Sequence, residues 1–263
     1  MEGYLSSLFN LQGKTALVTG GAKGIGRMIS EGLLQAGARV YISSRSAEDC
    51  ELAAQQMSAL GDCRAFPHDL SSMAGIASLV ADIEQAGHGL DILVNNSGAT
   101  WGAPLEDFPE SGWDKVMDLN VKSPFFLVQN LLPLLKAAGQ KGDPARVVNI
   151  SSVAGIVSGS QSAYSYMASK AAISHLNKGL AVDLAKDHIS VNAIAPGLFP
   201  SKMTRHLTTD EAIEMMGSLI PLGRIGEPND VAGLTIFLCS AAGAYLTGSV
   251  IPLAGGMDLG GGY

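Results

Sequence analysis

Short runs of β-branched and aliphatic residues alternate along the chain with longer segments in which apolar residues recur at helical spacing. Each run is apolar at successive positions, which is typical of strands that are covered on both faces in a parallel sheet. Between the first two runs, apolar positions three and four apart from Ile25 to Leu34 predict a helix that stops before Gly37. The seven runs predict strands at residues 15–19, 39–43, 63–66, 91–94, 146–150, 189–195 and 249–253.

This alternation favours the α/β class, with a doubly wound, seven-stranded parallel sheet and helices on both faces. The 263 residues fit one domain spanning 1–263, and no repeat or linker divides the chain. Residues 198–220 follow a late strand and break the rhythm, so we expect this segment to form a substrate lid.

Composition narrows the function classes. Hydrophobic residues make up 47% of the chain and charged residues 16%, enough for a large core. The net charge of −7 and the lack of a Lys/Arg run argue against a nucleic-acid partner. Neither a signal peptide nor a membrane span is predicted, so the cytoplasm is the expected location. Three dispersed cysteines, Cys50, Cys63 and Cys239, indicate neither a metal site nor a disulfide framework.

A glycine-rich segment joins the first predicted strand to the first predicted helix: residues 19–26 read Thr-Gly-Gly-Ala-Lys-Gly-Ile-Gly. Glycine allows the backbone to approach a diphosphate closely, and the helix N-terminus offers free N–H groups to its charge. The position between strand and helix favours a dinucleotide-binding Rossmann fold over an ordinary tight turn. The cofactor-binding candidates in this loop are Gly20, Gly21, Lys23, Gly24, Ile25 and Gly26.

The end of the second predicted strand distinguishes the two nicotinamide cofactors. An NAD site usually carries a carboxylate about 20 residues after the glycines. Here the segment 43–45 reads Ser-Ser-Arg, so Arg45 and Lys23 are predicted to bind the 2′-phosphate of NADP(H). The alternative is that Arg45 is simply solvated. Asp69 and Leu70 are expected on the adenine side, although Asp69 could instead cap the next helix.

Tyr166 and Lys170 form the most informative pair in the sequence. Four residues apart on a helix, their side chains project from one face and can converge on one site. A nearby ammonium would lower the pKa of the phenol from about 10 and ease proton transfer. This spacing alone is common by chance on amphipathic helices. Tyr164 is a less favoured candidate for the reactive tyrosine, because the residue four positions after it is Ala168 and not a lysine.

Polar residues also end predicted strands where open α/β sheets bind ligands, in segments 95–98 (Asn-Asn-Ser-Gly) and 149–152 (Asn-Ile-Ser-Ser), and Asn120 interrupts an apolar stretch. Together with the glycine loop and the Tyr166–Lys170 pair, these motifs resemble the short-chain dehydrogenase/reductase family from Lys14 to Gly256. The resemblance implies a catalytic set of Asn120, Ser152, Tyr166 and Lys170.

The resemblance also implies a role for each member of this set. Tyr166 would protonate the carbonyl oxygen, and Ser152 would hold that oxygen by a hydrogen bond. Lys170 would lower the pKa of the tyrosine and bind the nicotinamide ribose, and Asn120 would seat a water that links Lys170 to solvent. The family's serine commonly lies one residue nearer the tyrosine than Ser152 does, and a one-residue insertion in 155–163 would explain the difference. Ser151 is a less favoured candidate for the catalytic serine.

The same resemblance implies that Tyr166 and Lys170 also contact the cofactor. Further cofactor contacts follow from it: Asn96, Gly98, Pro196, Gly197, Phe199 and Ser201. The histidines are interpreted as ordinary because none has a carboxylate partner or metal spacing in the sequence: His68, His88, His175, His188 and His206. No metal is predicted. Four apolar side chains could line the substrate pocket or simply pack: Trp101, Phe108, Met215 and Met216.

Within the family the chain looks closest to 3-oxoacyl reductases, on segments 37–40, 97–102 and 203–206. This likeness implies NADPH-dependent reduction of a 3-oxoacyl thioester, or a similar β-keto compound, to the 3-hydroxy product. An acidic acyl carrier protein would need a basic docking site, to which Lys141, Lys178 and Lys186 could contribute. Asp187 stands where carrier-protein reductases commonly have arginine, so a free ketone, keto ester, secondary alcohol or coenzyme A thioester stays open.

Two further expectations concern the whole protein. A non-catalytic dinucleotide sensor on the same fold is the less favoured alternative, because all four catalytic positions are retained. The family resemblance implies a homotetramer in which long helices near 113–137 and 164–186 pack across subunits.

Overall fold

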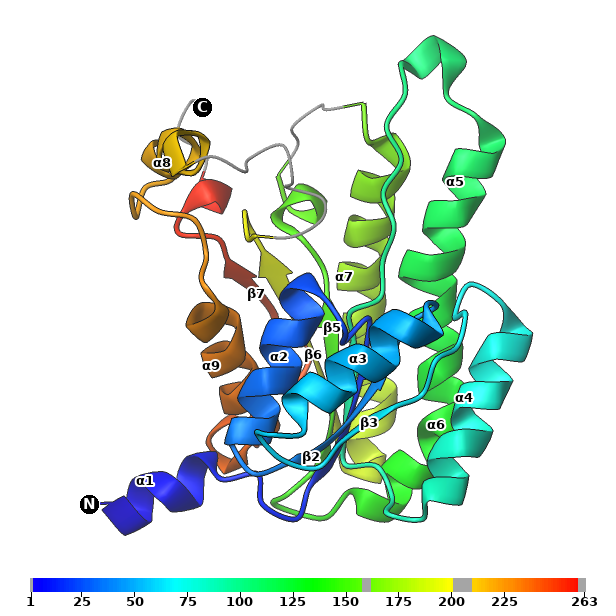
Figure 1. Cartoon of the computed structure of the whole chain (residues 1–263), viewed down its shortest axis with the longest axis vertical. Coiled ribbons are helices and arrows are strands. Elements are labelled where there is room, and N and C mark those ends of the chain that lie inside the picture. The colour runs from blue at the N-terminus through cyan, green and yellow to red at the C-terminus, as the bar shows by residue number, and fades with distance from the viewer. Residues whose placement is uncertain (1, 158–161, 201–209, 260–263) are drawn as a thin grey trace.

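A parallel sheet in the order β3-β2-β1-β4-β5-β6-β7 forms the centre of the computed structural model, which describes residues 2–157, 162–200 and 210–259 (Figure 1). Its strands are β1 (Thr15–Thr19), β2 (Arg39–Ser43), β3 (Cys63–Ala65), β4 (Ile92–Asn95), β5 (Ala145–Ile150), β6 (Ile189–Pro196) and β7 (Val250–Leu253). The seven predicted strands are confirmed, each to within one residue at either end.

Helices precede, connect and follow these strands, and local signals fix several of their ends. The Ser46 hydroxyl accepts a hydrogen bond from the Asp49 N–H at the start of α3, and Ser72 does the same for Gly75 in α4. Gly87 then ends α4 in the left-handed conformation, with φ of 73°. The described α-helices are α1 (Glu2–Phe9), α2 (Gly24–Gln35), α3 (Ala47–Met57), α4 (Met73–Ala86), α5 (Glu110–Met117), α6 (Ser123–Ala138), α7 (Tyr164–Leu184), α8 (Asp210–Ser218) and α9 (Pro228–Cys239).

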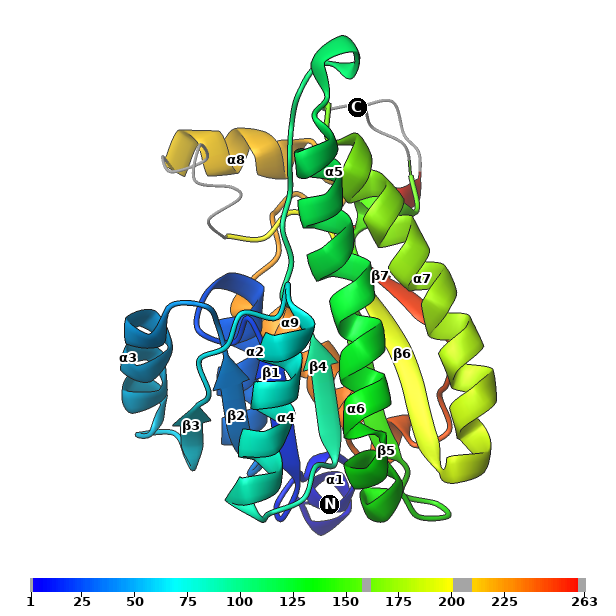
Figure 2. The ribbon, with the colours of Figure 1, turned by 90° about the vertical axis from the view of Figure 1, so that its right-hand side faces the viewer.

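Two apolar layers enclose the sheet because successive strand residues point to opposite faces. In β1, Ala16 and Val18 pack into the layer formed with α2, α3 and α9, whereas Leu17 packs into the layer formed with α4, α6 and α7. Figure 2 shows α4, α6 and α7 crossing one face of the sheet. All three of these β1 side chains are fully buried, which explains the continuous apolar runs in the sequence.

The strand order reverses between β1 and β4, and the loops that follow these two strands meet at one edge of the sheet. In open α/β sheets this is where ligands bind. The expected lid is described only as 198–200 and as 210–220, which contains α8; its middle, 201–209, lies outside the described residues. No helix in the described ranges is long and apolar enough to span a membrane.

Candidate active site

The turn after β1 is shaped by glycines that no other residue could replace without rearrangement. Gly20 and Gly24 have φ of 66° and 53°, and a Cβ added to Gly26 would lie 2.2 Å from the Gly20 carbonyl oxygen. Lys23 occupies the N-cap of α2 without a side-chain capping bond, so the first N–H groups of α2 remain directed at the cleft. The turn is therefore built to receive an anion.

Asn96 and Gly98 connect this turn to the next strand end. The Asn96 side-chain amide donates to the carbonyl oxygens of Thr19 at 2.9 Å and Gly20 at 3.3 Å. A Cβ on Gly98 would stand 3.3 Å from Asn120 Oδ1 and 3.8 Å from Lys170 Nζ. Both residues line the cleft, as the sequence predicted for cofactor contacts.

One large cleft of about 1100 Å³ runs from this turn to the end of β6. It is lined by predicted cofactor residues from five strand ends: Gly20, Lys23, Gly24, Ile25, Gly26, Arg45, Leu70, Asn96, Gly98, Pro196, Gly197 and Phe199. Gly21 lies behind the turn, where a Cβ would meet the Ile42 side chain at 2.6 Å. Ser201 lies outside the described residues.

Ser152, Tyr166 and Lys170 meet in the same cleft, although they come from the end of β5 and the start of α7. The Tyr166 phenol has a side-chain hydrogen bond with Ser152. Lys170 Nζ lies 5.6 Å from the centroid of the Tyr166 ring and donates to the Ile150 carbonyl oxygen at 2.8 Å. The predicted i, i+4 pair therefore does face one site.

The two ionisable groups have pKa shifts of different origin. Burial raises the pKa of the Tyr166 phenol, and the Ser152 hydrogen bond only partly offsets this effect. Burial also lowers the pKa of Lys170 to about 8. The direction of the Tyr166 shift therefore follows burial of the phenol, and the expected effect of Lys170 on the pKa of Tyr166 stays a prediction.

The neighbouring serines separate into two roles. The Ser151 hydroxyl is buried and bonds to the Lys170 carbonyl oxygen at 2.9 Å and to Ser174 Oγ at 2.6 Å, which anchors α7 to β5. Ser152 Oγ instead accepts from the Ala154 N–H at 3.2 Å and faces Tyr166. The geometry therefore favours Ser152 over Ser151 as the candidate catalytic serine.

Asn120 lies in a π-helical turn, Asp118–Lys122, between α5 and α6. Its amide is fully engaged: Oδ1 accepts from the Ala99 N–H at 2.8 Å, and Nδ2 donates to the Ala99 carbonyl at 3.0 Å and to Ser169 Oγ at 2.9 Å. Pro124 has no N–H, so the Asn120 carbonyl lacks the donor that a regular α-helix would supply. Turns of this kind often mark functional sites.

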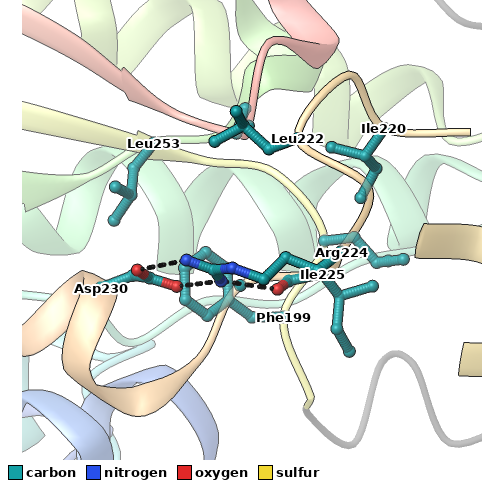
Figure 3. Close-up of a pocket in the computed structure, with 11 residues that line it drawn as sticks. Phe199, Ile220, Leu222, Arg224, Ile225, Asp230 and Leu253 are labelled. Carbon is teal, nitrogen blue, oxygen red and sulfur yellow. Dashed lines mark hydrogen bonds and ion pairs between the residues drawn. The ribbon is translucent and has the colours of Figure 1, made fainter. Parts of the chain in front are cut away.

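The loop after β6 is held from behind by the segment that precedes α9. A Cβ on Gly226 would lie within 2.5 Å of three atoms of the Phe199 ring, so the ring rests directly on Gly226. Figure 3 shows Phe199 beside a small cavity of about 70 Å³, with the Arg224–Asp230 ion pair alongside. Leu198 and Phe199 line both this cavity and the large cleft.

Apolar side chains also line this cleft. They are Val153, Val157, Met167, Leu198, Met216 and Met257. Of the residues left open in the sequence, Met216 lines the cleft, whereas Met215 is 67% exposed and does not. Trp101 packs on Gly112, and Phe108 packs against Trp113 and Tyr164, so these two aromatic side chains have packing roles.

Comparison with known proteins agrees with this geometry. A sequence model described as enoyl-(acyl carrier protein) reductase matches residues 20–258. The rhamnolipids biosynthesis 3-oxoacyl-[acyl-carrier-protein] reductase of Pseudomonas aeruginosa is 54% identical over 95% of this chain and 98% of its own length. This chain belongs to the short-chain dehydrogenase/reductase family.

The similarity extends to a solved structure and to a more distant relative. The solved Pseudomonas aeruginosa RhlG/NADP active-site complex has a TM-score of 0.93 and 52% identity, over 96% of this chain and 99% of its own. A tropinone reductase homologue of Arabidopsis thaliana is 37% identical over 96% of this chain and 95% of its own length. The fold class and the resemblance stated from the sequence are therefore confirmed.

The structure places the two residues expected on the adenine side, Asp69 and Leu70, differently from one another. Asp69 does not line the cleft; its Oδ1 accepts from the N–H and the hydroxyl of Ser71, at 3.1 and 2.8 Å. Leu70 and His68 line the cleft there. The interpretation of His68 as lacking a carboxylate partner is wrong, because its Nε2 lies 2.7 Å from Asp82 Oδ2 on α4.

The expectation that no carboxylate lies near the 2′-phosphate site also needs correction. The sequence offers no carboxylate at the end of β2, but the fold brings Asp49 of α3 into the cleft, where it forms an ion pair with Lys23. Arg45 is exposed in the cleft and forms no ion pair within the described part of the chain. In the sequence, only the closeness of Asp49 to Arg45, four residues away, could have indicated a carboxylate in the cleft. That prediction would also have required knowing that α3 begins at Ala47.

Proposed function

We propose that this protein is an NADPH-dependent reductase that converts a 3-oxoacyl thioester, or a similar β-keto compound, to its 3-hydroxy product. The observation that carries the proposal is the convergence of Ser152, Tyr166 and Lys170 at one part of a cleft whose other part is the glycine turn. The 3-oxoacyl reductase at 54% identity supports the substrate class.

The residues present fit a phosphorylated dinucleotide. Gly20 and Gly24 take positive φ, and the uncapped N-terminus of α2 offers N–H groups for a diphosphate. Arg45, exposed and without an ion-pair partner in the described residues, is available to a 2′-phosphate. The neighbour solved with NADP agrees with this assignment.

Bound NADPH would supply a hydride from its nicotinamide ring to the substrate carbonyl carbon. Tyr166 is placed to donate a proton to the resulting oxygen, and its raised pKa keeps the phenol protonated at neutral pH. Ser152 would hold the same oxygen by a hydrogen bond. Lys170 would bind the nicotinamide ribose, and the Asn120 carbonyl, to which Pro124 cannot donate, could accept from a water on the path to Lys170.

At the nicotinamide end, the expected contacts are Pro196, Gly197 and the backbone of Phe199, with Ser201 proposed from the family pattern alone. Gly197 is essential to the close packing there, because a Cβ would lie 2.9 Å from Ala254 and 3.1 Å from the Met257 sulfur. The apolar side chains that line the cleft, with their adaptable methionines, suit an acyl chain better than a sugar.

A free ketone or keto ester is the second candidate substrate. Asp187 forms an ion pair with Lys136 at 3.0 Å, which neutralises a basic side chain that could otherwise meet an acidic carrier protein. Lys141, Lys178 and Lys186 are exposed and could still do so. The similarity to a tropinone reductase homologue is compatible with a small free substrate.

The deciding experiment compares kcat/KM for a 3-oxoacyl carrier-protein thioester, its coenzyme A counterpart, a free ketone and a keto ester, each with NADPH and NADH. We expect NADPH to be preferred and an acyl thioester to give the highest value. A protein that binds NADPH but reduces only free ketones would contradict the substrate assignment.

Tyr166→Phe tests the mechanism. Loss of the proton donor should lower kcat by about 10²- to 10⁴-fold while NADPH affinity changes little, because the phenol is not needed to hold the diphosphate. Tyr164→Phe is the matched control, since Tyr164 packs against Phe108 on the same helix. Equal activity in both variants would exclude Tyr166 as the proton donor.

A further inference from the structure

The part of the cleft next to β2 holds two cations and one carboxylate. Lys23 extends from the N-cap of α2, Arg45 follows β2, and Asp49 lies in the first turn of α3; all three line the cleft. The Lys23 ammonium and the Asp49 carboxylate form an ion pair that joins α2 to α3. Arg45 has no such partner among the described residues.

The position of Asp49 is fixed by the fold. The Ser46 hydroxyl caps α3 by accepting from the Asp49 N–H at 3.2 Å, so the backbone of Asp49 cannot turn away without loss of the cap. Both ion-pair side chains are partly exposed, at 41% for Lys23 and 43% for Asp49, so solvent and a ligand can both reach them.

Any 2′-phosphate bound at Arg45 and Lys23 must therefore share Lys23 with Asp49. A phosphate monoester carries about −1.5 to −2 charge at neutral pH, and a carboxylate beside it repels it while neutralising one of its cations. The 2′-hydroxyl of NADH is neutral and can donate to a carboxylate, so Asp49 does not oppose NADH in this way.

We propose that Asp49 is a specificity-determining residue that limits the preference of this protein for NADPH over NADH, by holding Lys23 in an ion pair at the 2′-phosphate position. The inference rests on the proposed function, in that the cleft binds NADP(H). It goes beyond that function, because it identifies an acidic residue that acts against the favoured cofactor.

The test measures the Kd of NADPH and of NADH by the change in nicotinamide fluorescence, without turnover, for the wild-type protein, Asp49→Asn and Arg45→Ala. Asp49→Asn should bind NADPH about tenfold more tightly at low salt and NADH less than about twofold differently. The gain should largely vanish near 1 M salt, where the Debye length is about 3 Å.

Glu48→Gln is the matched control, because it removes the same charge from the same turn of α3 at a residue that does not line the cleft. Equal NADPH affinities in Asp49→Asn and Glu48→Gln would overturn the inference. Weaker NADPH binding in Asp49→Asn would also overturn it, since Asp49 would then position Lys23 for the phosphate. Failure of the wild-type protein to bind either cofactor would instead reject the proposed function, so the two failures are distinguishable.

Discussion

Lys170 carries its charge in surroundings that favour the neutral form. The residue is 5% exposed, and its ammonium donates a hydrogen bond to the Ile150 carbonyl oxygen at 2.8 Å. A single carbonyl dipole replaces only part of the lost hydration, so burial lowers the pKa to about 8. The ammonium beside Tyr166 is thus a cation that the fold itself destabilises.

This environment predicts a pH-dependent stability. The folded pKa of about 8 lies below the ordinary value of 10.5, so the unfolded chain binds the extra proton between these values. The free energy of unfolding contributed by Lys170 should therefore rise as pH increases from about 8 to about 10.5, by about 3 kcal/mol in full. It is lost again as pH falls through about 8.

Denaturant unfolding of the wild-type protein and Lys170→Met, at matched protein concentrations, checks this prediction. The difference between the two free energies should change across this pH range and level off below it. Two curves that run parallel from pH 7 to pH 10.5 would show that Lys170 is not strained by burial.

At the scale of elements, the loop after β6 depends on the segment that leads into α9. The Gly226 N–H donates to the Leu198 carbonyl oxygen at 2.9 Å, and the Phe199 ring rests on Gly226. Asp230 caps α9 through the Glu227 N–H at 2.8 Å and also binds Arg224 through two hydrogen bonds, at 2.6 and 2.9 Å. The end of the cleft beside β6 is thus supported by a helix outside it.

Gly226→Ala should disturb this support. Its Cβ would overlap the Phe199 ring at 2.3 to 2.5 Å, so the ring and its loop must move. We expect about 1–3 kcal/mol of destabilisation and a larger KM for NADPH, measured by thermal unfolding and initial rates.

Gly233→Ala is the control within α9. Gly233 is exposed and a Cβ there meets nothing within 4 Å, so alanine should stabilise the helix by about 0.5–1 kcal/mol and leave KM unchanged. A Gly226→Ala variant that behaves like Gly233→Ala would show that the loop does not depend on this contact.

At the scale of the whole molecule, several apolar side chains on the long helices are exposed in the single chain. Trp113 on α5 is 41% exposed, Phe125 on α6 36% and Val182 on α7 78%. The sequence-based expectation of a homotetramer places these helices across subunit contacts, which would cover the apolar surface. This assembly stays a prediction.

Val182→Glu should weaken the assembly, because a carboxylate would be buried without a partner at the contact. We expect light scattering to show a smaller mass at micromolar concentration than for the wild-type protein. Leu52→Glu on α3, where Leu52 is 51% exposed away from these helices, should leave the mass unchanged. Equal masses for wild type and Val182→Glu would remove Val182 from the interface.

Features that depend on neighbours along the chain could be predicted before the structure was known. Apolar runs such as Thr15–Thr19 predicted the strands, because strands covered on both faces must be apolar at successive positions. The glycine turn and the Tyr166–Lys170 pair followed from backbone sterics and helix spacing. These rules need no knowledge of which elements meet.

The tertiary structure alone decided the features that depend on the docking of distant elements. Asp49 reaches Lys23, and His68 reaches Asp82, only because α3 packs beside α2 and α4 beside the end of β3. The pKa directions of Tyr166 and Lys170 likewise depend on burial, which spacing does not reveal. Charge and hydration are set by three-dimensional neighbours, and those are fixed only when the sheet and its helices assemble.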